Sequence, residues 1–286
     1  MAKEWTFLRH DWPRLEANVE RYLLIDGAQC NHMQMLREKL RLPVRALFDG
    51  QLSDGSADAS VYLAKLPADA KVDSYLQCIE VSARGPGVLT LIDSSLHLND
   101  LQQWLQRRLD SIYPNGKPFL SRFYDARVLP WWIQAMNAEQ RQTFLAVGTR
   151  WWYLSHNLRW ISQELHCPEM DPHDPPWVLE TDQRHALIES SYPYVLMDHF
   201  QLTDPGLLQR IPPSRWYIHI REVVAMASAL GIEDSRRVLM VVTWSLLAGE
   251  GFMTNGLWQA RLVDYASGKR DANVIIAEAW PVKENP

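Results

Sequence analysis

The hydrophobic pattern of the chain changes at a proline-rich stretch, and this change constrains the fold more than any other feature. Residues 167–177 read CPEMDPHDPPW and include four prolines. Proline lacks the amide hydrogen that helix interiors and central strands require. Before this stretch, short apolar runs alternate with segments of helical periodicity; after it, the periodicity is helical. The sequence therefore predicts an α/β lobe over residues 1–166, a proline-rich linker over 167–180 and an all-α lobe over 181–286.

The α/β lobe is predicted to contain a mixed, partly parallel sheet that is flanked by helices. Strands that alternate with helices tend to pair in parallel, because each helix returns the chain to the edge where the previous strand began. A hairpin over residues 151–161 is expected to add antiparallel edge strands. The other predicted strands cover residues 22–25, 44–48, 60–66, 77–81, 88–92 and 119–124.

Helices are predicted where apolar residues recur on one face and a capping residue precedes them. Asn99, Asn137 and Ser214 are the expected N-terminal caps of three helices, and Gly231 is expected to end the third of these. The apolar run 238–248 is too short to cross a bilayer and is predicted to be a buried helix. The other helices are expected over residues 31–40, 182–200 and 257–266.

Charge and cysteine content narrow the classes of protein that this chain can represent. Its 29 Lys and Arg and 34 Asp and Glu give a net charge of −5 at pH 7. Nucleic acids and anionic membranes attract basic faces, which argues against both as partners. Three widely spaced cysteines form neither a disulfide framework nor a zinc pattern. The first residues lack an apolar signal segment, so we expect a cytoplasmic protein that does not insert into membranes.

Aspartates follow several predicted strands, and no other pattern in the sequence points as clearly to chemistry. They are Asp26, Asp49, Asp93 and Asp125. Carboxylates that meet at strand ends can hold Mg²⁺ for phosphoryl transfer or hydrolysis. Aspartate before glycine or before a helix is also the residue that turns and helix caps require. A metal-dependent phosphoesterase-type enzyme and a purely structural role therefore both stay open.

Two further groups have the residue types of metal ligands. His219 and Glu222 lie one helical turn apart, which is also an ordinary arrangement on a helix surface. The other group has a spacing that matches no common zinc site, and it consists of His166, Cys167, Asp171, His173 and Asp174. The sequence contains no nucleophile elbow, phosphate loop or dinucleotide fingerprint. We therefore expect no catalytic residue, metal or cofactor.

Tryptophan is unusually frequent, with 13 residues against seven phenylalanines. Adjacent residues of a strand face opposite sides, so Trp151 and Trp152 are both buried only if helices cover both faces of the sheet. Otherwise one of them is exposed, and exposed tryptophans favour contacts with protein partners.

Four segments, taken in order, carry a resemblance to a known family. They are YLLIDGA (22–28), GVLTLID (87–93), LQRRLDSIYPNGKPFLSRFYDARVLPWW (105–132) and AEQRQTF (138–144). Over these segments the chain resembles the type VI secretion effector chaperones, also called adaptors. The most specific piece is FYD-x-RVL at residues 123–129, where Ala126 stands at a position that is frequently proline. Residues 229–252 also resemble the helical C-terminal lobe of longer members.

The resemblance implies a cytoplasmic bacterial protein without enzymatic activity. Such a protein binds one cognate toxin and helps to mount it on the VgrG spike. The resemblance also implies an α/β lobe followed by a helical lobe, and it supplies no catalytic, metal-binding or cofactor-binding residues.

The leading hypothesis is a non-catalytic chaperone or adaptor whose partners are a cognate effector (toxin) protein and the VgrG spike protein. The alternatives are the metal-dependent enzyme and a structural component of a larger complex. A groove between the lobes is the expected place for a partner to bind. The candidate partner-binding residues are Phe123, Tyr124, Arg127, Trp131, Trp132 and Trp151.

Overall fold

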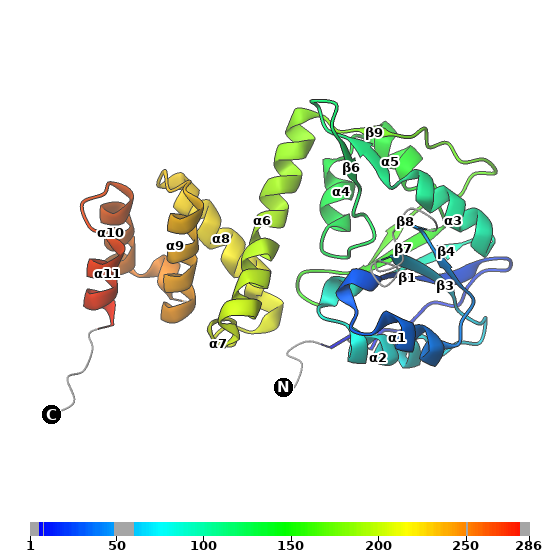
Figure 1. The fold of residues 1–286 in the computed structure, drawn as a ribbon, viewed down its shortest axis with the longest axis horizontal. Helices are drawn as coiled ribbons and strands as arrows, with labels where there is room; N and C mark the ends of the chain where they lie inside the picture. Colours follow the sequence, from blue (N-terminus) through cyan, green and yellow to red (C-terminus); the bar gives the residue numbers. More distant parts are fainter. Residues whose placement is uncertain (1–5, 8, 49–59, 250, 281–286) are drawn as a thin grey trace. The chain divides into compact units, whose positions relative to one another are not determined.

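The computed structural model describes residues 6–7, 9–48, 60–249 and 251–280. The chain forms two compact units, Met1–Ser191 and Tyr192–Pro286 (Figure 1). The division falls after Ser191, whereas the sequence predicted a linker at 167–180.

The main sheet of the first unit has six strands in the order β2-β3-β1-β4-β7-β8. Every pairing in it is antiparallel, so the predicted partly parallel character is wrong for this sheet. Strands β3 and β4 precede and follow helix α2 (Val72–Ser82) in the chain and run in the same direction. Strand β1 lies between them in the sheet and is antiparallel to both. The strands are β1 (Glu20–Asp26), β2 (Val44–Ala46), β3 (Val61–Lys65), β4 (Leu89–Ser94), β7 (Arg150–Leu154) and β8 (Trp160–Glu164).

A second, smaller sheet has the order β6-β5-β9. Strand β5 (Asp110–Ile112) pairs antiparallel with β6 (Pro118–Leu120) and parallel with β9 (Trp177–Val178). The predicted linker 167–180 therefore contributes a strand to the first unit, and its Trp177 is part of the hydrophobic core there.

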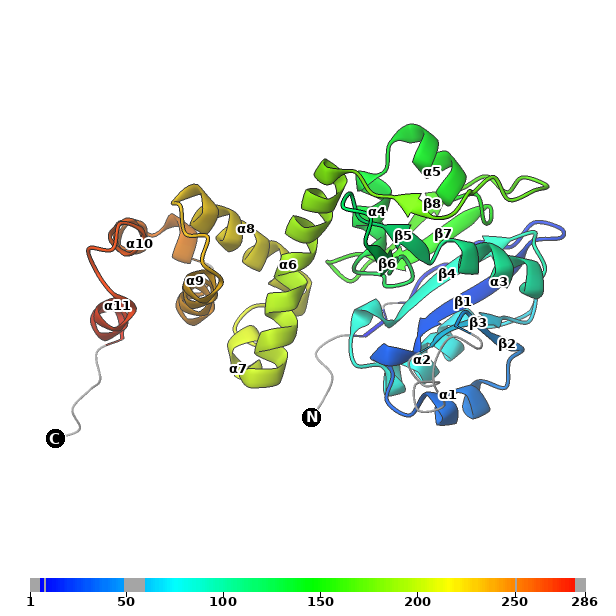
Figure 2. The same ribbon diagram turned by 45° about the horizontal axis from the view of Figure 1, so that its top comes forward.

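Helices cover both faces of the main sheet (Figures 1 and 2). One face packs against α1 (Met33–Leu40) and α2, and the other packs against α3 (Leu98–Arg107), α4 (Leu129–Ala135) and α5 (Ala138–Phe144). Trp151 and Trp152 are 0% and 6% exposed and belong to different cores, one on each face. Of the two alternatives that the sequence left open, the structure shows the one in which helices cover both faces of the sheet and both tryptophans are buried.

Two local predictions in this unit are wrong. The segment 77–81 was predicted as a strand but belongs to α2, whose buried residues Val72, Leu76 and Ile79 recur at helical spacing. Helix α3 begins at Leu98 and not after a cap at Asn99. Asn137, by contrast, caps α5 as predicted, and the structure shows that this cap is a capping box with Gln140.

The second unit is helical, as predicted. Its core includes Trp216, Trp244 and Trp258. Asp234 caps the buried helix that covers 238–248, and its carboxylate accepts a hydrogen bond from the Arg237 amide. Helix α6 begins in the first unit and continues into the second. The helices are α6 (Thr181–Thr203), α7 (Pro205–Leu208), α8 (Trp216–Ala229), α9 (Ser235–Ala248), α10 (Gly256–Ala266) and α11 (Ala272–Ala279).

Within the described residues, no helix has both the length and the apolar character that crossing a bilayer requires.

A buried ion pair joins the two central strands of the main sheet. Arg21 of β1 faces Asp93 of β4, and its Nε and Nη2 donate to the two carboxylate oxygens at 2.6 and 2.9 Å. The indole Nε1 of Trp152 donates to the same carboxylate at 3.0 Å. The Arg21 and Asp93 side chains are only 5% and 4% exposed. Because water does not reach them, each charge is stabilised by the opposite charge of its partner.

We predict that Asp93→Asn lowers the free energy of unfolding by about 3 kcal/mol, because it leaves the Arg21 guanidinium buried without its counter-charge. The matched control is Glu164→Gln, which breaks another cross-strand ion pair. In this pair Glu164 lies 2.7 Å from Arg150, and the Glu164 side chain is 70% exposed. The control should change stability by less than about 1 kcal/mol. Urea denaturation measures both values, and equal losses would contradict this account.

Candidate partner-binding site

Four of the candidate partner-binding residues are part of the hydrophobic core. Phe123, Tyr124, Trp132 and Trp151 are between 0% and 5% exposed. Trp131 is half-buried. A partner could reach these four buried rings only if the core opened.

These aromatic residues pack against one another. Phe123 meets Phe144 and Trp151 edge to face, with ring centroids 5.5 and 5.8 Å apart. Trp132 lies 4.3 Å from Trp177 and is stacked with Phe144 at 6.3 Å. Aromatic pairs at such separations add to the stabilisation that burial itself provides.

The sixth candidate, Arg127, belongs to an ion-pair cluster in the FYD-x-RVL element. Its Nε and Nη2 donate to the two oxygens of Asp125 at 3.1 and 3.0 Å. Arg122 donates to Asp125 at 3.0 Å and to Asp26 at 3.4 Å. Two buried carboxylates thus face two guanidinium groups, and the cluster ties the end of β1 to residues 122–127.

This cluster leaves no room for a side chain at Gly87. A Cβ atom there would lie 2.5 Å from the Asp125 carboxylate and 2.7 Å from Arg127 Nε. Burial, followed by the nearby charge of Asp125, raises the pKa of Asp26, although Gln29 and Arg122 oppose the shift. Burial likewise raises the pKa of Tyr124 to about 12. Asp26 and Tyr124 thus hold the FYD-x-RVL element in place.

The structure does not bring the strand-end aspartates together as a metal site. Asp26 accepts from the Ala28 amide at 3.0 Å as a turn residue, and Asp93 lies toward the opposite end of the paired strands. Asp49 lies outside the described residues. Across the described part of the chain, no group of three or more His, Cys, Asp or Glu side chains could hold a metal ion. These residues therefore offer the metal-dependent enzyme no ligand set, and the same holds for the residues of metal-ligand type at 166–174.

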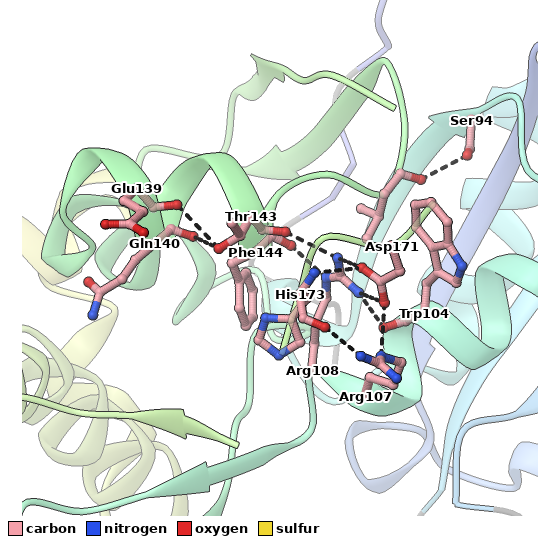
Figure 3. A network of polar contacts seen from close by, with 11 residues as sticks. Ser94, Trp104, Arg107, Arg108, Glu139, Gln140, Thr143, Phe144, Asp171 and His173 are labelled. Carbon is pink, nitrogen blue, oxygen red and sulfur yellow. Dashed lines mark hydrogen bonds and ion pairs between the residues drawn. The ribbon is translucent and has the colours of Figure 1, made fainter. Parts of the chain in front are cut away.

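A second polar network, which the sequence did not reveal, is centred on Arg108 (Figure 3). This guanidinium follows α3 and is fully buried. It donates to both oxygens of Asp171, at 2.7 and 3.1 Å. It also donates to three backbone carbonyls, those of Trp104, Thr143 and Phe144. All five donors of the guanidinium are thus in use, and they join α3, the end of α5 and the proline-rich segment.

Asp171 then organises the residues that follow it. Its Oδ1 accepts from the His173 amide at 3.1 Å. Arg107 pairs with the other carboxylate oxygen at 3.1 Å and donates to the His173 carbonyl at 2.6 Å. In the sequence, Arg107 and Arg108 resemble ordinary cations at the end of a helix. Their role is visible only in the structure, where both pair with Asp171, which lies 63 residues after Arg108.

The segment that Asp171 holds forms one wall of a pocket of about 370 Å³, and α5 forms the other. Charged groups at the pocket are the exposed carboxylates of Glu139 and Asp174. The complete lining is Glu139, Gln140, Thr143, Phe144, Pro172, His173, Asp174, Pro176, Trp177 and Val178. A second hollow, of about 490 Å³, lies over β5 and β6 and shares Pro176 with the first.

Comparison with known proteins gives one match. The model of a family described as "Domain of unknown function (DUF4123)" matches residues 21–143. This range runs from β1 to α5 and includes the FYD-x-RVL element, one wall of the pocket and Arg108. No curated protein and no solved structure matches the chain.

His173 gives the network a measurable pH dependence. Burial lowers the pKa of His173 from 6.5 to about 4, and the positive charge of Arg108 is the second cause of this shift. Between these values the unfolded chain binds a proton that the folded chain does not. The free energy of unfolding should therefore decrease by about 3 kcal/mol as the pH falls from about 6.5 to about 4. Denaturant titrations across this range should show a shallower decrease in His173→Asn.

The control for this prediction is His185→Asn, which replaces an exposed histidine of the same unit. It should keep the pH dependence of the wild type. The same slope in His173→Asn and in the wild type would show that the buried imidazole does not account for it.

Proposed function

We propose that this protein is a non-catalytic chaperone or adaptor that binds a cognate type VI secretion effector in the bacterial cytoplasm and helps to load it onto the VgrG spike. The observation that carries the proposal is the family match over residues 21–143. It covers nearly all of the four segments in which the chain resembles the effector adaptors. The second, helical unit agrees with the two-lobe organisation that the resemblance implies.

The disposition of charged residues in the first unit supports binding over catalysis. Asp26, Asp93, Asp125 and Asp171 all pair with arginines. A carboxylate that is neutralised in this way stabilises the fold and is poorly placed to serve as a general base or metal ligand.

The first unit also exposes apolar side chains where a partner could dock. On the small sheet, Leu120 and Val178 are 44% and 57% exposed, while the neighbouring Trp177 faces the core. Nearby in the sequence, Met170 is 82% exposed. Apolar groups of this kind on a sheet edge suit a protein partner better than a small substrate.

The proposal is tested by co-expression with the toxin that is encoded beside this gene. The two proteins should co-purify, and the toxin should be less soluble or shorter-lived when it is expressed alone. A binder of the folded toxin stabilises it by about 2.7 kcal/mol when the free binder exceeds Kd a hundredfold. A toxin that lacks its N-terminal region serves as the control and should not be retained.

A second arm of the same experiment addresses delivery. Deleting the gene should reduce the amount of toxin that reaches the VgrG spike. If no toxin co-purifies, and toxin level and delivery are unchanged in the deletion strain, the adaptor function is wrong.

A further inference from the structure

The main sheet ends in two edge strands whose backbones are treated differently. Strand β2 forms one edge and β8 the other (Figure 2). On β2, the carbonyls that point away from the sheet are those of residues whose flanking neighbours bond to β3. Both are occupied: Ala46 accepts from Gln102 Nε2 at 2.8 Å, and Val44 accepts from Arg45 Nη1 at 3.2 Å. Side chains thus close this edge, as native proteins commonly do to prevent pairing with other chains.

The pairing with β7 determines which backbone groups of β8 point away from the sheet. Hydrogen bonds close the pair at both ends: the Ser155 amide donates to the Arg159 carbonyl, and the Leu165 amide donates to the Thr149 carbonyl, both at 2.9 Å. Antiparallel partners alternate between residues that bond to each other and residues that do not. In the observed register, every second residue of β8 therefore bonds to β7, and the residues between them direct their backbone groups outward.

The outward backbone groups of β8 belong to Trp160, Ser162 and Glu164. The Glu164 carbonyl accepts from the Gln163 side chain at 3.0 Å. Within the described part of the chain, the amides of Ser162 and Glu164 and the carbonyls of Trp160 and Ser162 have no partner. Ser162 and Glu164 are exposed to solvent. This row of donors and acceptors at strand spacing is the template that an added strand requires.

Length and side chains define the strand that this edge would accept. Strand β8 has five residues, whereas the edge strands β6 and β9 of the small sheet have three and two. Ile161 is 42% exposed and would be covered by an apolar residue of an added strand. Glu164 is already paired with Arg150, but the exposed guanidinium of Arg159 forms no ion pair with any described residue. The charge left over along this edge is therefore positive.

We propose that an extended segment of the partner protein adds to β8 as a further strand of the main sheet, with an apolar residue beside Ile161 and an Asp or Glu beside Arg159. That this partner is the effector rests on the proposed function. Because backbone groups make the hydrogen bonds, the segment is defined by its extended conformation and by these two side chains.

Amide hydrogen exchange, followed by NMR on the full-length protein, tests the edge in two steps. In the free protein, the Ser162 and Glu164 amides should exchange at least about tenfold faster than those of Ile161 and Gln163, which bond to β7. In the complex with the co-expressed toxin, exchange at Ser162 and Glu164 should slow by at least about tenfold and stay unchanged at the other two. Equally slow exchange at all four amides of the free protein, or no protection in the complex, overturns the inference.

Two variants of one residue separate the backbone from the side chain. Ser162→Pro removes an amide hydrogen that makes no bond within the protein, and proline is tolerated at such edge positions. This variant should melt cooperatively and bind the toxin at least about tenfold more weakly. Ser162→Ala keeps the amide and should bind as the wild type does. If Ser162→Pro does not melt cooperatively, the exchange measurements on the wild type decide.

A charge reversal tests the acidic residue of the added strand. Arg159→Glu should weaken toxin binding about tenfold, because it places like charges beside each other. The control is Lys39→Glu, which reverses an exposed charge on α1 and should leave binding unchanged. Equal affinities of the two variants overturn the assignment of an acidic residue.

The outcomes separate this inference from the proposed function. If the toxin binds Ser162→Pro as tightly as the wild type, β8 is not the contact, and the adaptor function stands. If the toxin does not bind the wild type, the adaptor function fails, and the inference fails with it.

Discussion

The buried pair of Arg108 and Asp171 is the interaction on which the organisation of the first unit depends. Arg108 is fully buried, and a guanidinium in that position must be fully hydrogen-bonded and neutralised. Asp171 supplies the counter-charge and thereby fixes the proline-rich segment against α3 and α5. This explains why a stretch with the composition of a linker contributes a strand and a core tryptophan.

A second constraint is that the main sheet is covered on both faces. Each strand therefore presents apolar residues to both sides, and the neighbours Trp151 and Trp152 enter separate cores. The aromatic residues of the FYD-x-RVL element fill one of these cores, while its Asp125 and Arg127 close the ion-pair cluster beside Gly87. The element that most resembles the adaptor family is thus a structural connection between β1 and the helices over the sheet.

This arrangement changes where a partner should be sought. The buried rings of the resemblance segments serve the core, and the accessible features lie at the free edge of β8, at the small sheet and at the pocket beside α5. The family match ends at residue 143, within α5 and well before residues 172–178. The pocket therefore joins an element that the family model covers to a segment outside it.

The sequence by itself determined the features that depend on local periodicity and on capping. It predicted the two-part organisation, the hairpin of β7 and β8, the N-terminal cap at Asn137 and the buried helix over 238–248. For Asp26 it offered a turn role as one of two alternatives. These follow from side chains that are neighbours along the chain or lie one helical turn apart. Only the tertiary structure decided the strand order and direction, because β1 inserts between β3 and β4, and no local pattern encodes which strand comes between two others. The same holds for the Arg108–Asp171 pair and for the pocket that it supports. Arg108 and Asp171 are 63 residues apart, and no local pattern in the sequence indicates which distant residues folding brings together.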